Sequence, residues 1–503
     1  MCRGVIYLDK RCDLASMPNI IYILADDMGY GDLNCFNECS KIKTTYLDQL
    51  ASEGMRFTDA HSSSAVCTPS RYSILTGRYN WRSRLKKGVL GGYSPALIEP
   101  GRLTLASMLK ERGYSTFCIG KWHLGMNWTR LFEAEEKVGF GAIDGIDYNA
   151  PIEMGPVDFG FDYFYGISAS LDMPPYVYIE NNRCTQIPAH DTEGCEGKAF
   201  WRKGPTAPDF KHREVLPHLT EKVLGILNDG IEQPFFLYFS LPAPHTPILP
   251  TEEYIGKTGT NDYGDFVLMC DDMIGRVLKC LKENGLYENT LVVFTSDNGC
   301  SPMADYDELL RFGHNPSYIF RGYKADIYEG GHRVPLIVRW PGKIKPGSIC
   351  KELVCLVDFM ATIAEIVGYD LPYNAAEDSI SNLQLWLGSE LSKPFRDSIV
   401  HHSFDGSFSI RKNSWKLELC PGSGGWSYPK PGEEPDDYPP VQLYDLSMDI
   451  SERKNLYDKY PDIAKELFSL LLQYVRNGRS TPGIPVMNND EILLKDFINI
   501  FNY

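Results

Sequence analysis

Short apolar runs that alternate with segments of helical periodicity are the feature that most constrains the fold of this chain. A continuous apolar run is typical of a strand buried on both faces of a sheet, and four such runs occur, at residues 19–24, 115–119, 235–241 and 291–295. Apolar residues with helical spacing lie between them, at residues 103–112, 219–228 and 263–284. This alternation predicts an α/β fold in which a mainly parallel sheet is flanked by helices.

The chain changes character from about residue 394. Short alternating segments and one helical segment follow, at residues 407–411, 414–419, 441–446 and 461–477. We therefore expect an α/β domain over residues 17–393 and a smaller C-terminal subdomain over residues 394–503. The subdomain is predicted to contain a small antiparallel sheet with one helix packed on it, whereas residues 1–16 are expected to add little to the fold.

The charge balance restricts the partners of the protein. Asp and Glu number 66 against 50 Lys and Arg, for a formal net charge of −16. This balance argues against nucleic-acid binding, which needs a basic face, and an anionic substrate would have to be drawn in by a local basic pocket. No apolar run approaches the ~20 residues that a membrane helix needs, so we expect no membrane span.

The N-terminus and the cysteines bear on the compartment. The first residues lack the run of roughly 7–15 apolar residues found in a secretory signal, which predicts a cytoplasmic protein. A secreted or periplasmic location is the alternative if a natural signal is absent from this sequence. The 14 cysteines form no zinc-type CxxC pattern and are expected to be reduced thiols, although Cys184 and Cys195 could pair in an oxidising compartment.

A polar cluster follows each of the four predicted strands. In chain order the clusters contain Asp26-Asp27, Lys121-Trp122-His123, His245 and Asp297-Asn298. Ligands of open α/β sheets bind at the carboxyl ends of the strands. The four clusters therefore predict one composite site at a single edge of the sheet.

The acidic and amide residues of this predicted edge suit a hard cation. Asp26, Asp27, Asp297 and Asn298 all offer oxygen, which Ca²⁺ and Mg²⁺ prefer, and no cysteine–histidine cluster in the sequence competes for zinc. Adjacent carboxylates at a strand end are costly unless a cation neutralises them. An isolated Asp-Asp pair is also common in turns and helix N-caps, but a second acid–amide pair at an equivalent strand end favours the metal.

Residues 67–71, Cys-Thr-Pro-Ser-Arg, form the most specific segment of the sequence. A helix is predicted to begin at Pro69, since proline fits the first turn. Cys67 would then lie at a helix N-terminus beside free backbone N–H groups, with Arg71 four residues on and near the same face. The alternative is a buried cysteine ahead of an ordinary helix.

Residues 67–71, extended by Leu75-Thr76-Gly77-Arg78, resemble the signature of the type I formylglycine-dependent sulfatases, the arylsulfatase family of the alkaline phosphatase superfamily. Further matching segments follow the order of the family, at residues 26–27, 120–125, 244–247, 296–299, 324, 329–335, 443–446 and 455–456. Several ordered motifs, here spread over roughly residues 17–475, are far more specific than one motif.

The resemblance implies an alkaline-phosphatase-like α/β domain and a sulfuric ester hydrolase that contains Ca²⁺, or Mg²⁺. Asp26, Asp27, Asp297 and Asn298 would hold the ion, next to Cys67 after its conversion to formylglycine. The hydrated aldehyde is a gem-diol, in which one hydroxyl attacks sulfur and displaces the alcohol, and the other expels sulfate and restores the aldehyde. A formylglycine-generating enzyme or an anaerobic sulfatase-maturing enzyme is the implied partner.

The resemblance also implies roles for five further residues. Arg71, Lys121 and Lys324 would supply positive charge to the sulfate. His123 would act as a base when the aldehyde is regenerated, and His245 would protonate or polarise the leaving alcohol. Taken singly, such residues are more often surface lysines or structural histidines.

The substrate pocket is less well defined by the sequence. The candidates are Trp122, Trp81, Tyr176 and Tyr178 for stacking on a sugar ring, and Asp172, His190 and Arg84 for hydrogen bonds to its hydroxyls. Each of these is otherwise a plain core or loop residue. In the spacing after Cys67 the chain resembles arylsulfatases and galactosamine sulfatases more than the long glucosamine-type sulfatases, and this resemblance implies a sulfated carbohydrate of the galactose or N-acetylgalactosamine type.

Two other functions compete with this hypothesis. A phosphomonoesterase or phosphodiesterase on the same scaffold would typically place Ser or Thr where Cys67 stands and use two zinc ions, which the oxygen-rich predicted site argues against. A non-catalytic protein that binds sulfated glycans would fit if Cys67 were never converted. His332 lies in one of the matching segments but has no assigned chemical role.

Overall fold

The computed structural model describes residues 17–132, 139–389, 395–492 and 494–501 of the 503-residue chain. The predicted N-terminal extension, residues 1–16, lies outside the described residues. The predicted boundary between residues 393 and 394 lies outside them as well, so the division into two units at that point stays a prediction.

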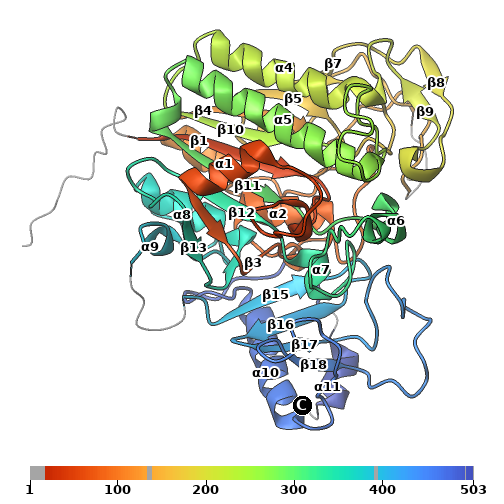
Figure 1. The fold of residues 1–503 in the computed structure, drawn as a ribbon, viewed down its shortest axis with the longest axis vertical. Helices are drawn as coiled ribbons and strands as arrows, with labels where there is room; N and C mark the ends of the chain where they lie inside the picture. The colour runs from red at the N-terminus through yellow and green to blue at the C-terminus, as the bar shows by residue number, and fades with distance from the viewer. Residues whose placement is uncertain (1–16, 133–138, 390–394, 493, 502–503) are drawn as a thin grey trace, which may run out of the picture.

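A ten-stranded sheet forms the centre of the molecule (Figure 1). In spatial order its strands are β13 (Ser348–Cys350), β2 (Met55–Phe57), β12 (Leu336–Arg339), β11 (Thr290–Ser296), β1 (Asn19–Ala25), β10 (Phe235–Ser240), β4 (Ser115–Lys121), β5 (Tyr163–Ile167), β6 (Ile179–Glu180) and β7 (Arg183–Cys184). The four strands predicted from apolar runs are β11, β1, β10 and β4, which lie side by side and pair in parallel. Every residue of β1, β10 and β11 is buried, as expected for strands covered on both faces.

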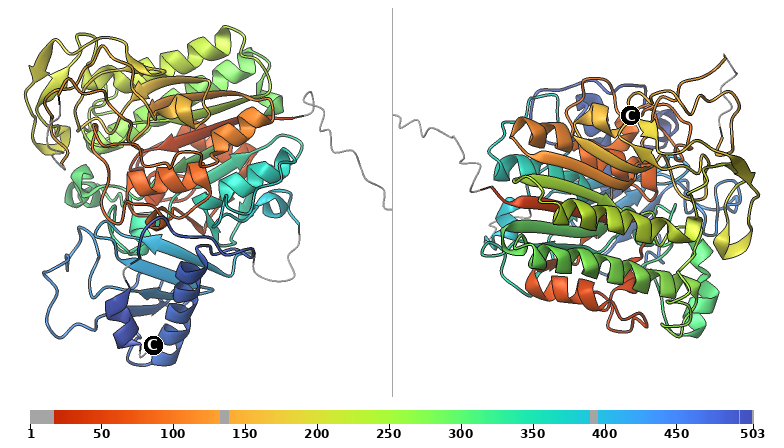
Figure 2. Two further views of the ribbon diagram at one scale, coloured as in Figure 1. Left: turned by 180° about the vertical axis from the view of Figure 1, so that it is seen from behind. Right: turned by 90° about the horizontal axis from the view of Figure 1, so that it is seen from above.

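Helices cover both faces of this sheet (Figure 2). One face carries α1 (Thr45–Glu53), α4 (Val215–Asn228) and α5 (Asp262–Glu283). The other carries α2 (Cys67–Thr76), α3 (Leu105–Glu111) and α8 (Phe359–Ile366). Three short helices are α6 (Tyr306–Arg311), α7 (Glu329–His332) and α9 (Leu383–Trp386). The predicted α/β fold with a mainly parallel sheet is confirmed.

A second sheet of four antiparallel strands lies at one end of the molecule (Figure 1). Its strands are β15 (Ser398–His402), β16 (Phe408–Lys412), β17 (Trp415–Glu418) and β18 (Gln442–Asp445). The helix α10 (Pro461–Asn477) contacts β16 and β17, and α11 (Lys495–Ile500) lies nearby. The predicted small antiparallel sheet with a packed helix is therefore confirmed.

The two parts of the fold share side chains. Tyr79 and Trp81, which follow α2, are fully buried in the hydrophobic core of the four-stranded sheet. Two further pairs of short strands complete the structure: β3 (Ala60–His61) with β14 (Val354–Cys355), and β8 (His190–Thr192) with β9 (Gly204–Thr206).

The structure differs from the sequence-based expectations in three details. The helix α2 begins at Cys67, two residues before the predicted start. The strand β15 has no counterpart among the predicted segments. Cys184 and Cys195, the pair considered for an oxidising compartment, are both free thiols. Among the described residues, no helix combines the length and the hydrophobicity needed to cross a membrane.

Candidate active site

The carboxyl ends of β1, β4, β10 and β11 meet at one edge of the large sheet, and the polar clusters that follow them lie together there. Backbone hydrogen bonds join the loops: the N–H of Asp26 donates to the carbonyl of Ala243 at 3.0 Å, and the N–H of Asp297 donates to the carbonyl of Ala25 at 3.1 Å. The parallel register thus brings residues that are far apart in the sequence into one polar centre.

Three buried carboxylates form the centre of the site. One carboxylate oxygen from each of Asp26, Asp27 and Asp297 lies within 4.8 Å of the others. The side-chain amide of Asn298 donates to Asp27 Oδ1 at 2.7 Å, while Asp26 Oδ1 and Asn298 Oδ1 are buried without a hydrogen-bond partner. Buried oxygens that converge in this way fit a hard divalent cation such as Ca²⁺.

Three buried cations surround the carboxylates. Lys121 Nζ lies 2.7 Å from Asp26 Oδ2, and Lys324 Nζ lies 2.7 Å from Asp27 Oδ2. Arg71 Nη2 lies 2.7 Å from Asp297 Oδ2, and its Nη1 donates to Ser240 Oγ and to the carbonyl of Lys121. Arg71 Nη2 is also 3.4 Å from Asp26 Oδ1. Each predicted cation is therefore present at the site and paired with at least one carboxylate.

The pKa values of two carboxylates diverge. Burial raises the pKa of Asp297 above its ordinary value, and the neighbouring Asp26 adds to this effect although Arg71 opposes it. Burial acts in the same direction on Asp26, but Lys121, His245 and Arg71 outweigh it and hold the pKa of Asp26 well below its usual range. Arg71 lowers the pKa of both Asp26 and Asp297. A divalent cation beside these two carboxylates would keep both ionised.

Cys67 lies at the N-terminus of α2 and lines a pocket beside this centre. Its sulfur and one ligand atom each of Asp26 and His245 lie within 4.8 Å of one another. Burial raises the pKa of the Cys67 thiol, although Lys121 and Lys324 oppose the change. The unmodified thiol is therefore neutral near pH 7 and a poor nucleophile, since the thiolate is the reactive form.

The two predicted histidines have different hydrogen-bond partners at the site. His245 Nε2 is 3.6 Å from Asp27 Oδ2, and its Nδ1 is 2.6 Å from the carbonyl of Thr246. His123 Nε2 is 2.7 Å from the carbonyl of Leu90, and its Nδ1 is buried without a partner. Burial lowers the pKa of both histidines, further lowered by Lys324 for His245 and by Lys121 for His123, so both are neutral.

The pocket has a volume of about 400 Å³. Cys67, His245 and Lys324 line it at the polar centre, and Asp172 lines its wall. Arg202 Nη1 lies 2.5 Å from Asp172 Oδ2 and belongs to the same wall. Asp172 is therefore the one predicted hydroxyl-binding residue that lines this pocket among the described residues.

The remaining predicted wall residues lie elsewhere. Trp122 is in the main hydrophobic core, where it packs on Phe159 and its indole N–H donates to the carbonyl of Gly125 at 2.9 Å. Trp81 is in the core of the second sheet, and Tyr176 and Tyr178 are also buried in core packing. Their full burial leaves no ring face for a sugar, so the stacking role predicted for these four aromatic residues is not supported.

The two other predicted hydroxyl-binding residues are also outside this pocket. His190 is exposed on β8, and Arg84 lines a separate, neighbouring cavity and donates to the carbonyl of Pro95 at 2.7 Å. Arg84 is in a loop and His190 is on a short strand of a two-stranded sheet, and the position of both depends on tertiary packing that the sequence pattern does not encode.

Sequence analysis missed most of the pocket wall. The rings and the cation that line it, besides the predicted residues, are Phe140, Phe200, Phe404, Trp426 and Arg202. Phe140, Phe200 and Arg202 come from loops between β4 and β9, and Phe404 and Trp426 come from the segments that connect the strands of the second sheet. No motif marks them, because each is a single aromatic or basic residue in a loop.

The comparisons with known proteins agree with this geometry. A family model described as "Sulfatase" matches residues 18–369, and a model described as "N-sulphoglucosamine sulphohydrolase, C-terminal" matches residues 322–418. The first match spans more than half of the chain. The chain therefore belongs to the sulfatase family and is a sulfuric ester hydrolase.

Similar proteins cover nearly the whole chain. An N-acetylgalactosamine-6-O-sulfatase of Bacteroides thetaiotaomicron is 34% identical over 90% of this chain and 92% of its own length. Human arylsulfatase A is 31% identical over 92% of this chain and 87% of its own length. A solved Bacteroides thetaiotaomicron structure, described as part of the metabolism of multiple glycosaminoglycans, has a TM-score of 0.78 at 33% identity and covers 91% of this chain and 99% of that chain.

Proposed function

We propose that this sulfatase removes the 6-O-sulfate of an N-acetylgalactosamine- or galactose-type sugar, with Cys67 converted to formylglycine and Ca²⁺ bound beside it. The observation that carries the proposal is the position of Cys67, at a helix N-terminus, on the pocket surface and within 4.8 Å of Asp26 and His245. The similarity to an N-acetylgalactosamine-6-O-sulfatase supports the choice of sugar and of sulfate position.

The two implied groups supply distinct chemistry. Once formed at Cys67, formylglycine would supply a hydrated aldehyde as the covalent nucleophile, which would take the sulfate from the departing alcohol and then release it. Asp26, Asp27, Asp297 and Asn298 would hold the Ca²⁺, which polarises sulfate oxygens when it is bound. The two buried oxygens without hydrogen-bond partners, on Asp26 and Asn298, support this ligand set.

The three cations have different tasks in this proposal. Lys324 lines the pocket, so its ammonium contacts the sulfate and offsets the charge that develops on the leaving oxygen. Lys121 and Arg71 are fully buried behind the carboxylates. They orient Asp26 and Asp297 and lower the cost of burying these acids.

The hydrogen bonds of the histidines support an acid and a base. The Thr246 carbonyl holds Nδ1 of His245, so Nε2 is the nitrogen that exchanges a proton with the leaving alcohol. The Leu90 carbonyl accepts from Nε2 of His123, so the partner-free Nδ1 carries a lone pair and accepts a proton when the aldehyde is regenerated. Both histidines are neutral. His123 can therefore act as a base directly, whereas His245 must first take up a proton before it can act as an acid.

The pocket suits one sugar ring with a charged substituent. Its volume of about 400 Å³ lies within the range of small-molecule sites, ~300–1,000 Å³. Phe404 and Trp426 offer apolar ring faces to a sugar. The Asp172–Arg202 pair offers an acceptor and donors for its hydroxyls.

Paired substrates test the proposal. The matured enzyme, supplied with Ca²⁺, is given N-acetylgalactosamine 6-sulfate, its 4-sulfate isomer and N-acetylglucosamine 6-sulfate, and the sulfate released is measured by ion chromatography. We expect kcat/KM for the first to exceed the other two by at least about 10-fold, because a misplaced hydroxyl leaves buried polar groups unpaired. Equal rates would reject the sugar assignment, and hydrolysis of phosphate esters alone would favour the phosphoesterase.

The proposed chemistry requires a second enzyme. Conversion of the Cys67 –CH₂–SH group to an aldehyde is an oxidation that also removes the sulfur, and the sulfatase reaction supplies no oxidant for it. We propose a formylglycine-generating or anaerobic sulfatase-maturing enzyme as the partner. The anaerobic type fits the cytoplasmic location predicted from the sequence.

A further inference from the structure

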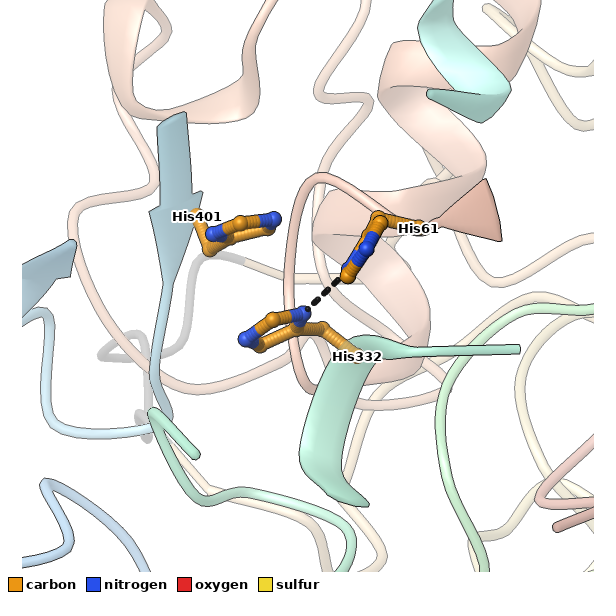
Figure 3. Close-up of side chains that lie close together, drawn as sticks. All are labelled: His61, His332 and His401. Atoms are coloured by element: carbon orange, nitrogen blue, oxygen red, sulfur yellow. Dashed lines mark hydrogen bonds between the residues drawn. The ribbon is translucent and has the colours of Figure 1, made fainter. Parts of the chain in front are cut away.

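Three histidines outside the active site meet where the second sheet packs against the first domain (Figure 3). His61 is on β3, His332 is the last residue of α7 and His401 is on β15. All three side chains are fully buried. The proposed sulfatase reaction uses none of them.

The ring nitrogens of these histidines converge. Nδ1 of His61 and Nδ1 of His332 lie 3.0 Å apart, and one nitrogen of the His401 ring points toward His61 (Figure 3). One nitrogen from each ring lies within 4.8 Å of the others, and His401 Nε2 is buried without a partner. The ligand nitrogens of a tetrahedral zinc site with Zn–N bonds of ~2.0–2.1 Å are about 3.3 Å apart. The rings of His332 and His401 stack with their centroids 3.7 Å apart, so binding of an ion would require these two rings to turn until their nitrogens face it.

The second nitrogen of each ring is already held by an outer group. The pairs are His61 Nε2 with Asp59 Oδ1 at 2.8 Å, His332 Nε2 with the Ile327 carbonyl at 3.0 Å, and His401 Nδ1 with Ser409 Oγ at 3.0 Å. Metal-bound histidines typically use their second nitrogen in this way, with a carboxylate, carbonyl or similar group that fixes the ring.

The electrostatic environment also suits a metal. Burial lowers the pKa of all three histidines, so the rings are neutral, which is the form that binds metal. Negative charge is close: Asp59 bonds to His61, and Glu329 Oε2 lies 3.9 Å from His61 Nε2. Two cations are also close, and each is paired with an acid. Lys416 Nζ lies 3.1 Å from His332 Nε2 and 2.6 Å from Glu452, and Arg411 lies 3.3 Å from His61 Nε2 and 2.7 Å from Asp59.

We propose that His61, His332 and His401 form a second metal site, which takes a borderline transition-metal dication of the Zn²⁺ class. Imidazole nitrogen suits such an ion, whereas the oxygens at the strand ends suit Ca²⁺. The ion would join β3 and α7 to β15. It would thereby hold the segment from Lys324 to His332, whose first residue reaches the active site and whose last residue ligates the metal.

Metal analysis of the full chain tests the proposal. A Cys67→Ala background is used, since the Cys67 thiol beside Asp26 and His245 could otherwise supply a competing zinc site. The protein is equilibrated with Zn²⁺ in excess Ca²⁺ and dialysed, and bound zinc is measured by inductively coupled plasma mass spectrometry. We expect roughly one zinc per chain, and a rise in Tm that a chelator reverses.

Variants locate the ion. His401→Ala and His332→Ala should each lose the zinc, and Ser409→Ala, which keeps all three ligands, should weaken zinc binding about 10- to 100-fold. The matched control is His314→Gln, because His314 is also a fully buried histidine bonded to a carboxylate, Asp32, but lies outside the cluster. It should keep the zinc.

Two results would overturn the proposal. The first is a folded Cys67→Ala chain that holds no zinc above the dialysis buffer, which would leave the three histidines as a hydrogen-bonded chain without metal. The second is zinc binding that survives in both His401→Ala and His332→Ala. The first result needs no histidine variant, so the test stands even if those variants fail to fold.

Discussion

The strand-end site and the histidine cluster are two buried polar regions that a single segment connects. Lys324 begins this segment and pairs with Asp27 at the strand-end site, whereas Glu329 and His332 end it and belong to the cluster. Both regions contain a buried lysine with carboxylate partners. The strand-end site opens into a pocket of about 400 Å³, whereas the three histidines of the cluster are fully buried.

The difference shows that buried charge alone does not identify a catalytic residue. Lys416 has Glu452 at 2.6 Å, Glu418 at 3.2 Å and Glu329 at 3.3 Å, so its charge is fully enclosed by protein. Lys324 has one close carboxylate and also faces the pocket. We therefore expect changes at the strand-end site to alter rate, and changes at the cluster to alter stability.

The largest effect is expected at Cys67. Cys67→Ala removes the precursor of the nucleophile and should lower kcat for sulfate esters by at least about 10⁴-fold, with little change in Tm. The matched control is Cys280→Ala on α5, which replaces a thiol far from the pocket and should keep the activity. Sulfate release with the two purified variants measures the difference, and full activity in Cys67→Ala would remove the basis of the mechanism.

The two lysines give the sharpest comparison between the regions. Lys324→Met should lower kcat by about 10²–10³-fold, as expected for loss of a charge that stabilises the transition state. Lys416→Met should keep kcat per folded molecule but lower the free energy of unfolding by about 3–5 kcal/mol, because it leaves buried glutamates unpaired. Initial-rate kinetics and urea unfolding of both variants measure these effects. Equal losses of kcat would contradict the distinction between a catalytic Lys324 and a structural Lys416.

His212 tests whether water is excluded from the protein near the pocket wall, as it is from the histidine cluster. It stacks on Trp201 behind the wall, and burial lowers its pKa from 6.5 to about 4. Because the folded pKa lies below the unfolded value, the stabilisation is present above pH ~6.5 and is lost as pH falls toward ~4, by up to about 3 kcal/mol in total. Urea unfolding at several pH values should show a weaker loss in acid for His212→Asn.

The control for His212 is a histidine on the same side of the molecule. His190→Asn replaces an exposed side chain on β8 and should keep the wild-type dependence of unfolding free energy on pH. If the unfolding free energy of His212→Asn also depends on pH as in the wild type, water reaches His212. The packing near the pocket wall would then differ from the packing of the histidine cluster.

A smaller effect is expected for the pocket wall. Asp172→Asn keeps the shape but removes the charge that pairs with Arg202 at 2.5 Å, and we expect KM to rise about 10-fold with kcat nearly unchanged. Arg84→Ala, in the neighbouring cavity, should change kcat/KM for a monosaccharide by less than about 2-fold. Initial-rate kinetics test both, and a larger effect for Arg84→Ala would extend the binding site into that cavity.

The centre of the fold could be predicted because strands buried on both faces leave continuous apolar runs. β1, β4, β10 and β11 carry that signature, whereas the edge strands β7 and β13 are two and three residues long and partly exposed. The start of α2 was predicted from Pro69, but the chain is already helical at Cys67 because Val66 is the extended residue that caps it. Pro69 is the third residue of α2, so it lies in the first turn but not at the first helical position, where proline is most common.

The strand-end residues could also be predicted, since each follows a recognisable strand and parallel strands end at one edge. The aromatic wall and the histidine cluster could not. Phe404 and Trp426 reach the pocket from the second sheet's loops, and His61, His332 and His401 are single histidines on three elements. Only the packing of the second sheet against the first brings such residues together, and no local pattern encodes that packing.

The most direct test of the central claim is peptide mass spectrometry of Cys67 in active enzyme purified from its native host. The tryptic peptide spanning residues 57–71 contains Cys67 and ends at Arg71. We predict a mass about 18 Da below that of the unmodified peptide, as expected for conversion of the thiol to the aldehyde that provides the covalent nucleophile. Active enzyme in which this peptide carries only the free thiol would contradict the account.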